Sequence, residues 1–283
     1  MINYEGILKR NLVMCLLAVG LLSASLSGRV SAKTETIAAV TRYDLDGNTG
    51  RDRLEIKGKD TKGDSLIKEL QFTINGKAAG SVAVPQYPAG DITCELVKTR
   101  AKAIFLMVNG TVGEDDSDFV LLSLQNGRFA EVLKASDVIE AKKYVMNAAR
   151  ITYQKRSGKA DEQFVVHSVD SSESLGAHDT EICYAIKGSR VVKKSPIYRT
   201  KVLYAKTLTA ARKITVYASP ISKEKVFTLK KGDKVKISRY YDAKKGFRIF
   251  VKRTSDGKKG WVNGIKNYTG NPLFEGVSMP EAE

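Results

Sequence analysis

The chain contains few of the residues that carry most hydrolytic chemistry. Of its 283 residues only two are His and three are Cys. Two histidines without H-x-x-E-H spacing do not supply the clustered ligands of a zinc hydrolase. The sequence also lacks G-x-S-x-G and phosphate-loop motifs, and no pair of acidic residues stands out as a glycosidase couple. We therefore predict that the protein is not an enzyme.

One arrangement keeps an enzymatic alternative open. Cys94 precedes His167 and His178, which is the order of nucleophile and base in papain-like peptidases. However, the sequence Asp91-Ile-Thr-Cys94-Glu-Leu-Val97 is typical of a strand, whereas such a nucleophile projects from a helix start. A diverged peptidoglycan hydrolase that uses Cys94 is the alternative to a non-enzymatic protein.

Long apolar runs are scarce as well. The run Leu12–Leu22 follows Lys9 and Arg10 and leads to Val30-Ser31-Ala32, which is the order of parts in a secretory signal peptide. The run is too short to span a bilayer core of about 30 Å. We predict a signal peptide over residues 1–32, export to the cell wall or the extracellular space, and no transmembrane segment after cleavage.

Export changes what the cysteines mean. Cys15 leaves with the predicted signal peptide, so that Cys94 and Cys183 remain. Both lie in apolar surroundings, and the sequence fits either one disulfide or two buried free thiols.

Acidic residues are few in the C-terminal part. Residues 187–283 contain 24 Lys and Arg against 7 Asp and Glu, whereas residues 33–186 contain 20 against 23. This asymmetry predicts a polyanionic partner for the C-terminal part. For an exported chain with a cell-wall-type module, which the resemblance of its last quarter described below implies, that partner is a teichoic-acid-type wall polymer or an anionic lipid, not nucleic acid. The alternative is a solvated face that keeps the protein soluble.

Strand-forming segments recur along residues 33–194. Three apolar hairpins close at Asn75-Gly76, Asn126-Gly127 and Lys187-Gly188, and the two Asn-Gly turns lie 51 residues apart. Asn-Gly favours two-residue hairpins because both residues tolerate positive φ, and a period near 50 is typical of propeller blades and similar meanders. Between the second and third hairpins, residues 136–149 predict a short amphipathic helix, with a strand pair through Tyr144 and Ile151 to Tyr153 as the alternative.

An acidic loop precedes the first hairpin. Asp44, Asp46, Asn48 and Asp52 occupy positions 1, 3, 5 and 9 of a loop that runs into a strand. Oxygen ligands at alternate positions suit a hard cation. The loop resembles the aspartate-rich repeat of integrin-alpha-type bacterial β-propellers, although Thr49 stands where that repeat has Gly. The resemblance implies that these four residues bind a structural calcium ion. The alternative is a hydrophilic turn in which Asp and Asn cap their own backbone.

The last quarter of the chain contains three ordered motifs. They are Val216-Tyr-Ala-Ser-Pro220, Leu229-Lys-Lys-Gly-Asp233 and Asp256-Gly-Lys-Lys-Gly-Trp-Val262. In this order they closely resemble the bacterial SH3-like domain of cell-wall proteins. The resemblance implies a small β-barrel over residues 205–268 that targets the protein to peptidoglycan. We predict that residues 195–204 connect it to a propeller-like domain over residues 33–194, and that residues 269–283 form a disordered tail.

Aromatic and basic residues next to each other predict where this module binds. The candidate ligand-binding residues are Arg239, Tyr240, Tyr241, Lys244, Lys245 and Trp261. Aromatic rings can cover sugars or peptide stems while the cations meet phosphate or carboxylate groups. Strand alternation requires one of the two tyrosines to face the interior, and Trp261 is favoured for packing over ligand contact.

These features together predict an all-β, exported, non-enzymatic binding protein. A propeller-like, calcium-stiffened N-terminal domain would be a platform for another extracellular protein or a glycan. The SH3-like module would bind peptidoglycan or an anionic wall polymer.

Overall fold

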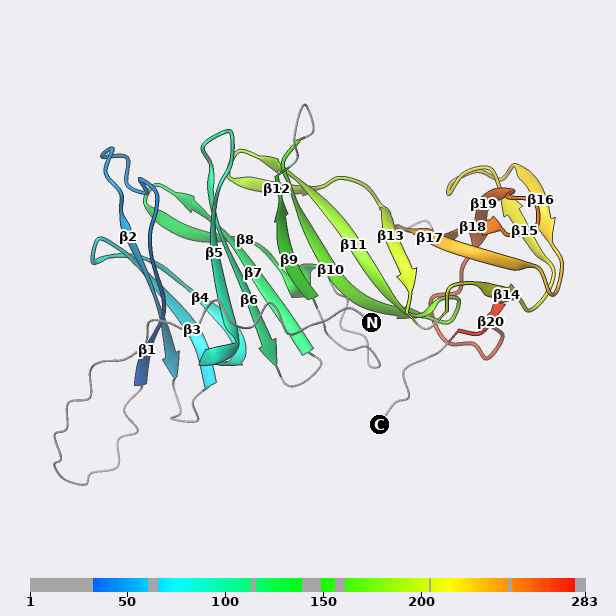
Figure 1. Ribbon diagram of the computed structural model, residues 1–283, viewed down its shortest axis with the longest axis horizontal. Helices are drawn as coiled ribbons and strands as arrows, with labels where there is room; N and C mark the ends of the chain where they lie inside the picture. Colours follow the sequence, from blue (N-terminus) through cyan, green and yellow to red (C-terminus); the bar gives the residue numbers. More distant parts are fainter. Residues whose placement is uncertain are drawn as a thin grey trace, which may run out of the picture. The chain divides into compact units, whose positions relative to one another are not determined.

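The computed structural model describes residues 33–60, 66–112, 116–138, 149–155, 161–203, 205–243 and 246–277 (Figure 1). Their regular structure is antiparallel β-sheet apart from two single-turn 3-10 helices, η2 (Ala89–Asp91) and η3 (Ala135–Asp137). The prediction of a mainly β protein is confirmed. The predicted signal peptide lies outside the described residues.

The first sheet is a four-stranded meander in which each strand pairs with the next along the chain. Its strands are β1 (Lys33–Thr41), β2 (Arg53–Asp60), β3 (Leu66–Ile74) and β4 (Lys77–Pro88). The turn between β3 and β4 places Asn75 at φ 51° and Gly76 at φ 78°. Two successive positive φ values are what the tight hairpin turn requires, so the Asn-Gly pair fixes this connection.

The same meander occurs twice more. The second sheet contains β5 (Ile92–Lys98), β6 (Ile104–Val112), β7 (Asp116–Gln125) and β8 (Arg128–Lys134). The third group contains β9 (Ala149–Gln154), β10 (Gln163–Ser172), β11 (Gly176–Lys187) and β12 (Arg190–Lys193). Asn126-Gly127 closes β7 on β8, and Gly188 begins the turn from β11 to β12. The turns of the three predicted hairpins therefore join the last two strands of three four-stranded units.

The second sheet is buried on both faces. Leu106 and Val108 belong to the apolar core shared with the first sheet, whereas Phe105 and Met107 belong to the core shared with the third. Ring contacts join the layers on either side, with centroids 5.4 Å apart for Phe72–Phe129 and 5.1 Å for Phe105–Phe164. Burial on both faces explains why residues 104–108 form an unbroken apolar run and not an alternating one.

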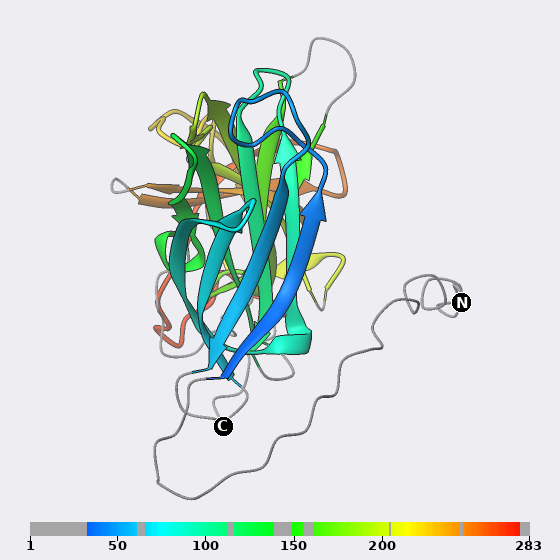
Figure 2. The same ribbon diagram turned by 90° about the vertical axis from the view of Figure 1, so that its left-hand side faces the viewer.

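The face of the first sheet that is turned away from the second sheet is charged. Glu55 forms ion pairs with Arg53 at 2.7 Å and with Lys57 at 3.8 Å, and Lys59 pairs with Glu69 at 3.7 Å. These residues alternate with the buried ones along β2 and β3, so they share the face turned away from the second sheet. Figure 2 shows this first sheet, in blue and cyan, from the side of that face. A charged outer face suits a terminal unit because it gives no apolar surface for a further sheet.

The third meander continues into the C-terminal part through one strand. Strand β13 (Ile197–Val202) pairs with β11 on one side and with β17 (Lys234–Ala243) on the other. The sheet then continues through β18 (Gly246–Arg253), β19 (Lys259–Asn263), β15 (Ile214–Tyr217) and β16 (Lys225–Leu229). Two short strands, β14 (Leu208–Ala210) and β20 (Phe274–Glu275), lie off this path. The predicted connector, residues 195–204, thus contains a strand of a 12-stranded sheet.

The predicted small barrel is not closed in the described residues. The two ends of β17 take different partners, because Val235 pairs with Leu208 in β14 whereas Tyr240 pairs with Tyr198 in β13. Strand β17 therefore extends out of the C-terminal module and joins the third meander. No sheet among the described residues closes on itself.

The predicted disordered tail needs correction, and the predicted helix lies mostly outside the described residues. Residues 269–277 belong to the predicted disordered tail, but Phe274 in β20 is fully buried and Leu273 is nearly so. The tail is ordered there because its apolar residues complete the core. Most of the predicted helix, residues 139–148, lies outside the described residues, as do residues 278–283. Ile151 to Tyr153, the second strand of the alternative pair, lie in β9, whereas Tyr144 of the first strand lies outside the described residues.

Candidate functional site

The outer face of the C-terminal sheet collects basic and aromatic side chains. Val235, Val251 and Val262 are fully buried on the inner face of β17, β18 and β19. Because side chains alternate along a strand, their neighbours lie on the opposite face. We call this surface the basic face. It contains Tyr217, Lys236, Arg239, Arg248, Phe250, Lys252, Lys259 and Trp261.

Three lysines stand in one line across the basic face. Lys236 in β17 is the direct partner of Lys252 in β18, and Lys252 is the direct partner of Lys259 in β19. All three are exposed, and among the described residues none of their side chains forms an ion pair or hydrogen bond. Adjacent strands lie about 4.8 Å apart, and like charges placed directly opposite destabilise a sheet. This lysine ladder is therefore a local cost in stability that a bound anion would remove.

A row of rings and guanidinium groups, which we call the aromatic row, lies beside the ladder. Arg239, Phe250, Trp261 and Tyr217 are successive partners across β17, β18, β19 and β15. The Arg239 Cζ atom lies 4.4 Å from the centroid of Phe250, whose ring meets that of Trp261 edge-on at 5.2 Å. At the far end Arg248 lies 4.5 Å over Tyr217, and its guanidinium donates hydrogen bonds to the carbonyls of Ser219 and Ser222. Arginines lie over Phe250 and Tyr217, the two neighbours of Trp261 in this row. Trp261 itself is only 5 % exposed, although it lies on the outer face.

The predicted ligand-binding residues divide between the two faces. Arg239 and Trp261 lie on the basic face and are linked through Phe250. Tyr240 faces the interior, where its hydroxyl lies 3.2 Å from that of Thr180 and burial raises its pKa far above the usual range. Tyr241 is opposite Arg248 but is also buried. Lys244 and Lys245 lie outside the described residues.

Only part of the basic face could be predicted from the sequence. Lys234 and Lys236 alternate along one strand, which predicts that they share a solvent face. The registers that align Lys236 with Lys252 and Lys259 depend on contacts between strands, which no local pattern shows. Phe250, Arg248 and Tyr217 were missed for the same reason.

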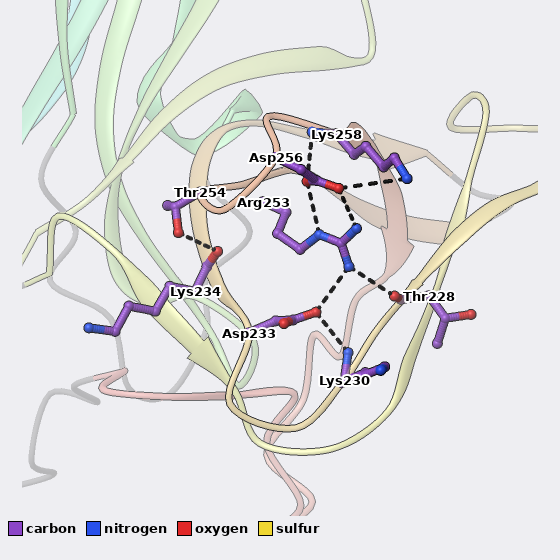
Figure 3. A network of polar contacts seen from close by, with 8 residues as sticks. All are labelled: Thr228, Lys230, Asp233, Lys234, Arg253, Thr254, Asp256 and Lys258. Carbon is purple, nitrogen blue, oxygen red and sulfur yellow. Dashed lines mark hydrogen bonds and ion pairs between the residues drawn. The ribbon is translucent and has the colours of Figure 1, made fainter.

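An arginine on the inner side of the sheet holds the strand ends that carry the ladder (Figure 3). Arg253 donates two hydrogen bonds to Asp256, of 3.0 and 2.6 Å, and one of 3.2 Å to Asp233. It thereby joins the Lys231-Gly-Asp233 turn to the Asp256-Gly257 turn, both of which belong to the motifs found in the sequence. Its hydrogen bonds lower the pKa of Asp256, and the Lys230 amide together with Arg253 lowers the pKa of Asp233. The network fixes the ends of β16, β17 and β18 next to Lys252.

The acidic loop brings three of its four predicted ligands together. One carboxylate oxygen from each of Asp44, Asp46 and Asp52 lies within 4.8 Å of the others. Such a set of hard oxygen donors fits a calcium ion. The fourth predicted ligand, Asn48, instead accepts a hydrogen bond from the Gly50 amide with its side-chain oxygen and donates to Asp46. Calcium binding at this loop therefore stays a prediction.

The same carboxylates also cap the loop backbone, as the alternative for this segment predicted. Asp44 accepts from the amides of Gly47 and Thr49. Asp52 is buried and accepts from the amides of Leu45 and Asp46 and from the side chain of Asn75. Burial alone would raise the pKa of Asp52, but the Asn75 and backbone hydrogen bonds outweigh it and lower the pKa. Asn75, which belongs to the first Asn-Gly turn, is a partner of the loop that the sequence did not reveal.

The two cysteines are free thiols in different sheets. Burial raises the pKa of Cys94 in β5 to about 12, so that its thiol stays protonated. No hydrogen bond among the described residues joins Cys94 to a histidine. His167 lies 3.1 Å from the Thr152 hydroxyl, and burial and Arg150 lower its pKa. The Nδ1 atom of His178 lies 2.8 Å from the carbonyl oxygen of Gly176.

Comparison of the chain with protein-family models, curated proteins and solved structures found no match in any of the three. Among the described residues, no helix has the length and apolar character needed to cross a membrane.

Proposed function

We propose that the protein is an exported, non-enzymatic binding protein that its basic face holds at an anionic polymer of the cell wall. The observation that carries this proposal is the lysine ladder, three exposed like charges in direct register with no protein partner among the described residues. The excess of 24 basic over 7 acidic residues in residues 187–283 supports it. So does the resemblance of the C-terminal motifs to SH3-like wall-targeting domains.

In this proposal the C-terminal sheet is an SH3-like module opened by its union with β13. The three meanders form a propeller-like stack, stiffened by calcium at the acidic loop, that presents a surface to another extracellular protein or a glycan. Peptidoglycan bearing anionic polymer is the partner of the module. The lysines act as point charges along the polymer, and the aromatic row lies beside its uncharged parts.

Co-sedimentation of residues 33–283 with isolated Gram-positive-type walls tests the proposal. Walls with and without teichoic acid are compared at low and high salt. We expect Lys236→Gln/Lys252→Gln/Lys259→Gln to lose binding, because interactions of exposed charges are additive over a polymer and screened by salt. The control variant replaces Lys187, Lys206 and Lys213, three exposed lysines outside the ladder, and removes the same net charge.

Equal loss of binding in both variants would contradict a site at the ladder and leave only non-specific attraction. Binding that survives teichoic-acid removal and high salt would assign the contact to peptidoglycan itself. Absence of wall binding by the unmodified protein would overturn the proposal.

A further inference from the structure

The aromatic row continues beyond the C-terminal module onto the third meander. Arg239 in β17 is the direct partner of Arg199 in β13, and Arg199 is the direct partner of Glu181 in β11. Side chains of direct partners lie on one face of a sheet, so Arg199 and Arg239 stand side by side on the same surface as Phe250 and Trp261. This surface therefore crosses the boundary between the two halves of the chain.

A groove of about 610 Å³ opens at this crossing. Its lining includes Asp179, Glu181, Arg199, Lys201, Ser238 and Arg239. Ser238 lies at a β-bulge, where the register between β17 and β18 shifts between Ile237 and Arg239. Bulges re-aim the neighbouring side chain, and here the bulge precedes the arginine that faces the groove.

The two arginines are available to a ligand. The Arg199 side chain is 71 % exposed, and its ion pair with Glu181 is long, at 3.9 Å. Phe250 covers one side of the Arg239 guanidinium, and no hydrogen bond or ion pair joins that guanidinium to another described residue. Two like charges directly opposite each other destabilise the sheet, as in the ladder, but planar guanidinium groups add the geometry to grip an anion.

We propose that this groove is a phosphodiester-binding subsite in which Arg199 and Arg239 clamp one phosphate group of a polyol phosphate polymer. This inference rests on the proposed function and names the chemistry of its polymer. A polymer that follows the row would leave the C-terminal module and lie across β13 and β11.

The arrangement favours phosphate over carboxylate. A tetrahedral phosphate offers oxygens in several directions and can accept from two guanidinium forks that approach from adjacent strands. A carboxylate presents its two oxygens in one plane and suits a single fork. Asp179 and Glu181 stand in the same groove and can accept hydrogen bonds from hydroxyl groups, which a polyol phosphate carries beside each phosphate. A purely anionic polymer without hydroxyls would meet these two carboxylates unfavourably.

The test is a titration of residues 33–283 with three probes: poly(glycerol phosphate), polyglutamate of equal charge number, and vesicles containing phosphatidylglycerol. Calorimetry gives the affinity, and the fluorescence of Trp261, the single tryptophan, reports on the row. We expect tighter binding of the phosphate polymer than of polyglutamate. Arg199→Gln and Arg239→Gln should each weaken phosphate-polymer binding roughly tenfold and polyglutamate binding much less, as loss of one charge-assisted partner predicts.

Matched variants separate the clamp from general charge. Arg199→Lys and Arg239→Lys keep the charge but remove the fork, so they should also lose the preference for phosphate. Lys187→Gln removes one charge elsewhere and should preserve that preference. Thermal unfolding of each variant checks the fold, and Arg199, which packs on no ring, gives a result independent of the contact with Phe250.

The outcomes distinguish this inference from the proposed function. Equal loss for phosphate and carboxylate polymers in the arginine variants would overturn the phosphate subsite while the polymer-binding function stands. Failure of every probe to bind would overturn both. Binding to vesicles but not to the free polymer would support the phosphate chemistry and overturn a polymer as its source.

Discussion

The carboxylate of Glu173 accepts hydrogen bonds from both the backbone amide and the hydroxyl of Thr269, at 2.6 and 2.7 Å, although 96 residues separate the two. Its other oxygen accepts from the amide of Asn271 at 2.6 Å. Glu173 lies in the turn between β10 and β11, so this carboxylate anchors the segment that leads to β20. Burial raises its pKa, but the three hydrogen bonds prevail and lower it.

We expect Glu173→Gln to lower the stability of the protein at pH 7 and to flatten its pH dependence in acid. A folded-state pKa below the unfolded value of about 4.3 adds stability above that value, and this stability is lost as the pH falls through the folded pKa. Urea unfolding between pH 7 and pH 3 measures both effects. Glu224→Gln, at an exposed residue, is the control and should follow the unmodified protein.

The pair Asp52 and Asn75 predicts a loop that is stable without a metal ion. Asp52→Asn should destabilise the protein by about 2 kcal/mol even in chelator, because it removes the charged acceptor of buried hydrogen bonds. Urea unfolding in chelator measures this loss. Asp44→Asn should cost less in chelator, since its partners lie at the exposed end of the loop.

Calcium is then tested separately at the same loop. If calcium binds, its addition should raise the melting temperature of the unmodified protein, and Asp44→Asn should abolish this rise. An identical melting temperature with calcium and with chelator would contradict the calcium prediction and leave the loop as a self-capping turn.

The network around Arg253 requires the geometry of a guanidinium group and not only its positive charge. Arg253→Lys keeps the positive charge but cannot donate to Asp256 and Asp233 together, so we expect a lower melting temperature. Lys258→Gln removes only an exposed ion pair with Asp256, at 3.7 Å, and should have little effect. An unchanged melting temperature for Arg253→Lys would contradict the geometric requirement and show that the charge alone is sufficient.

The contact between the first and second sheets has a narrow point at Gly80 in β4. A Cβ atom there would lie 2.9 Å from the carbonyl oxygen of Phe129, and the residue has φ +115°. Gly80→Ala should therefore cost roughly 2 kcal/mol in unfolding free energy, from backbone strain and overlap together. Gly90→Ala, where an added Cβ meets no atom within 4 Å, is the control in the same urea unfolding experiment. Equal stability of the two variants would show that the sheets are not closely packed at β4.

We expect the thiol of Cys94 to be alkylated slowly in the folded protein. Because burial raises its pKa to about 12, we expect Cys94 to react far more slowly with iodoacetamide at pH 8 in the folded protein than in urea. Mass spectrometry of the unreduced protein should also show two free thiols. Rapid modification of folded Cys94 would revive its role as a nucleophile.

The hairpins were predictable because their turns depend on local chemistry. Asn75-Gly76 and Asn126-Gly127 need positive φ at both positions, and the flanking apolar residues mark the strands. The unbroken apolar run at residues 104–108 held further information, namely that one sheet would lie between two others. These features are encoded within a few residues of each other.

The candidate site was less predictable because its parts meet through pairing between distant segments. Lys236 faces Lys252 and Lys259 only in one register, and that register changes at Ser238. Arg199 meets Arg239 across 40 residues, inside a segment expected to be a connector. Asn75 reaches Asp52, and Glu173 holds Thr269, by the same kind of contact. A sequence shows which residues can interact but not which of them are brought together.

The pairing of strand β13 determines whether the chain can be divided into two separate domains. Its two hydrogen-bonding edges are both occupied, one by β11 and the other by β17. Cutting the chain after residue 204 would expose the edge of β13 that pairs with β17. Its backbone amides and carbonyls would then be unpaired and could pair with strands of other molecules. Neither half would behave as an autonomous domain, and heating should melt residues 33–277 as one cooperative transition.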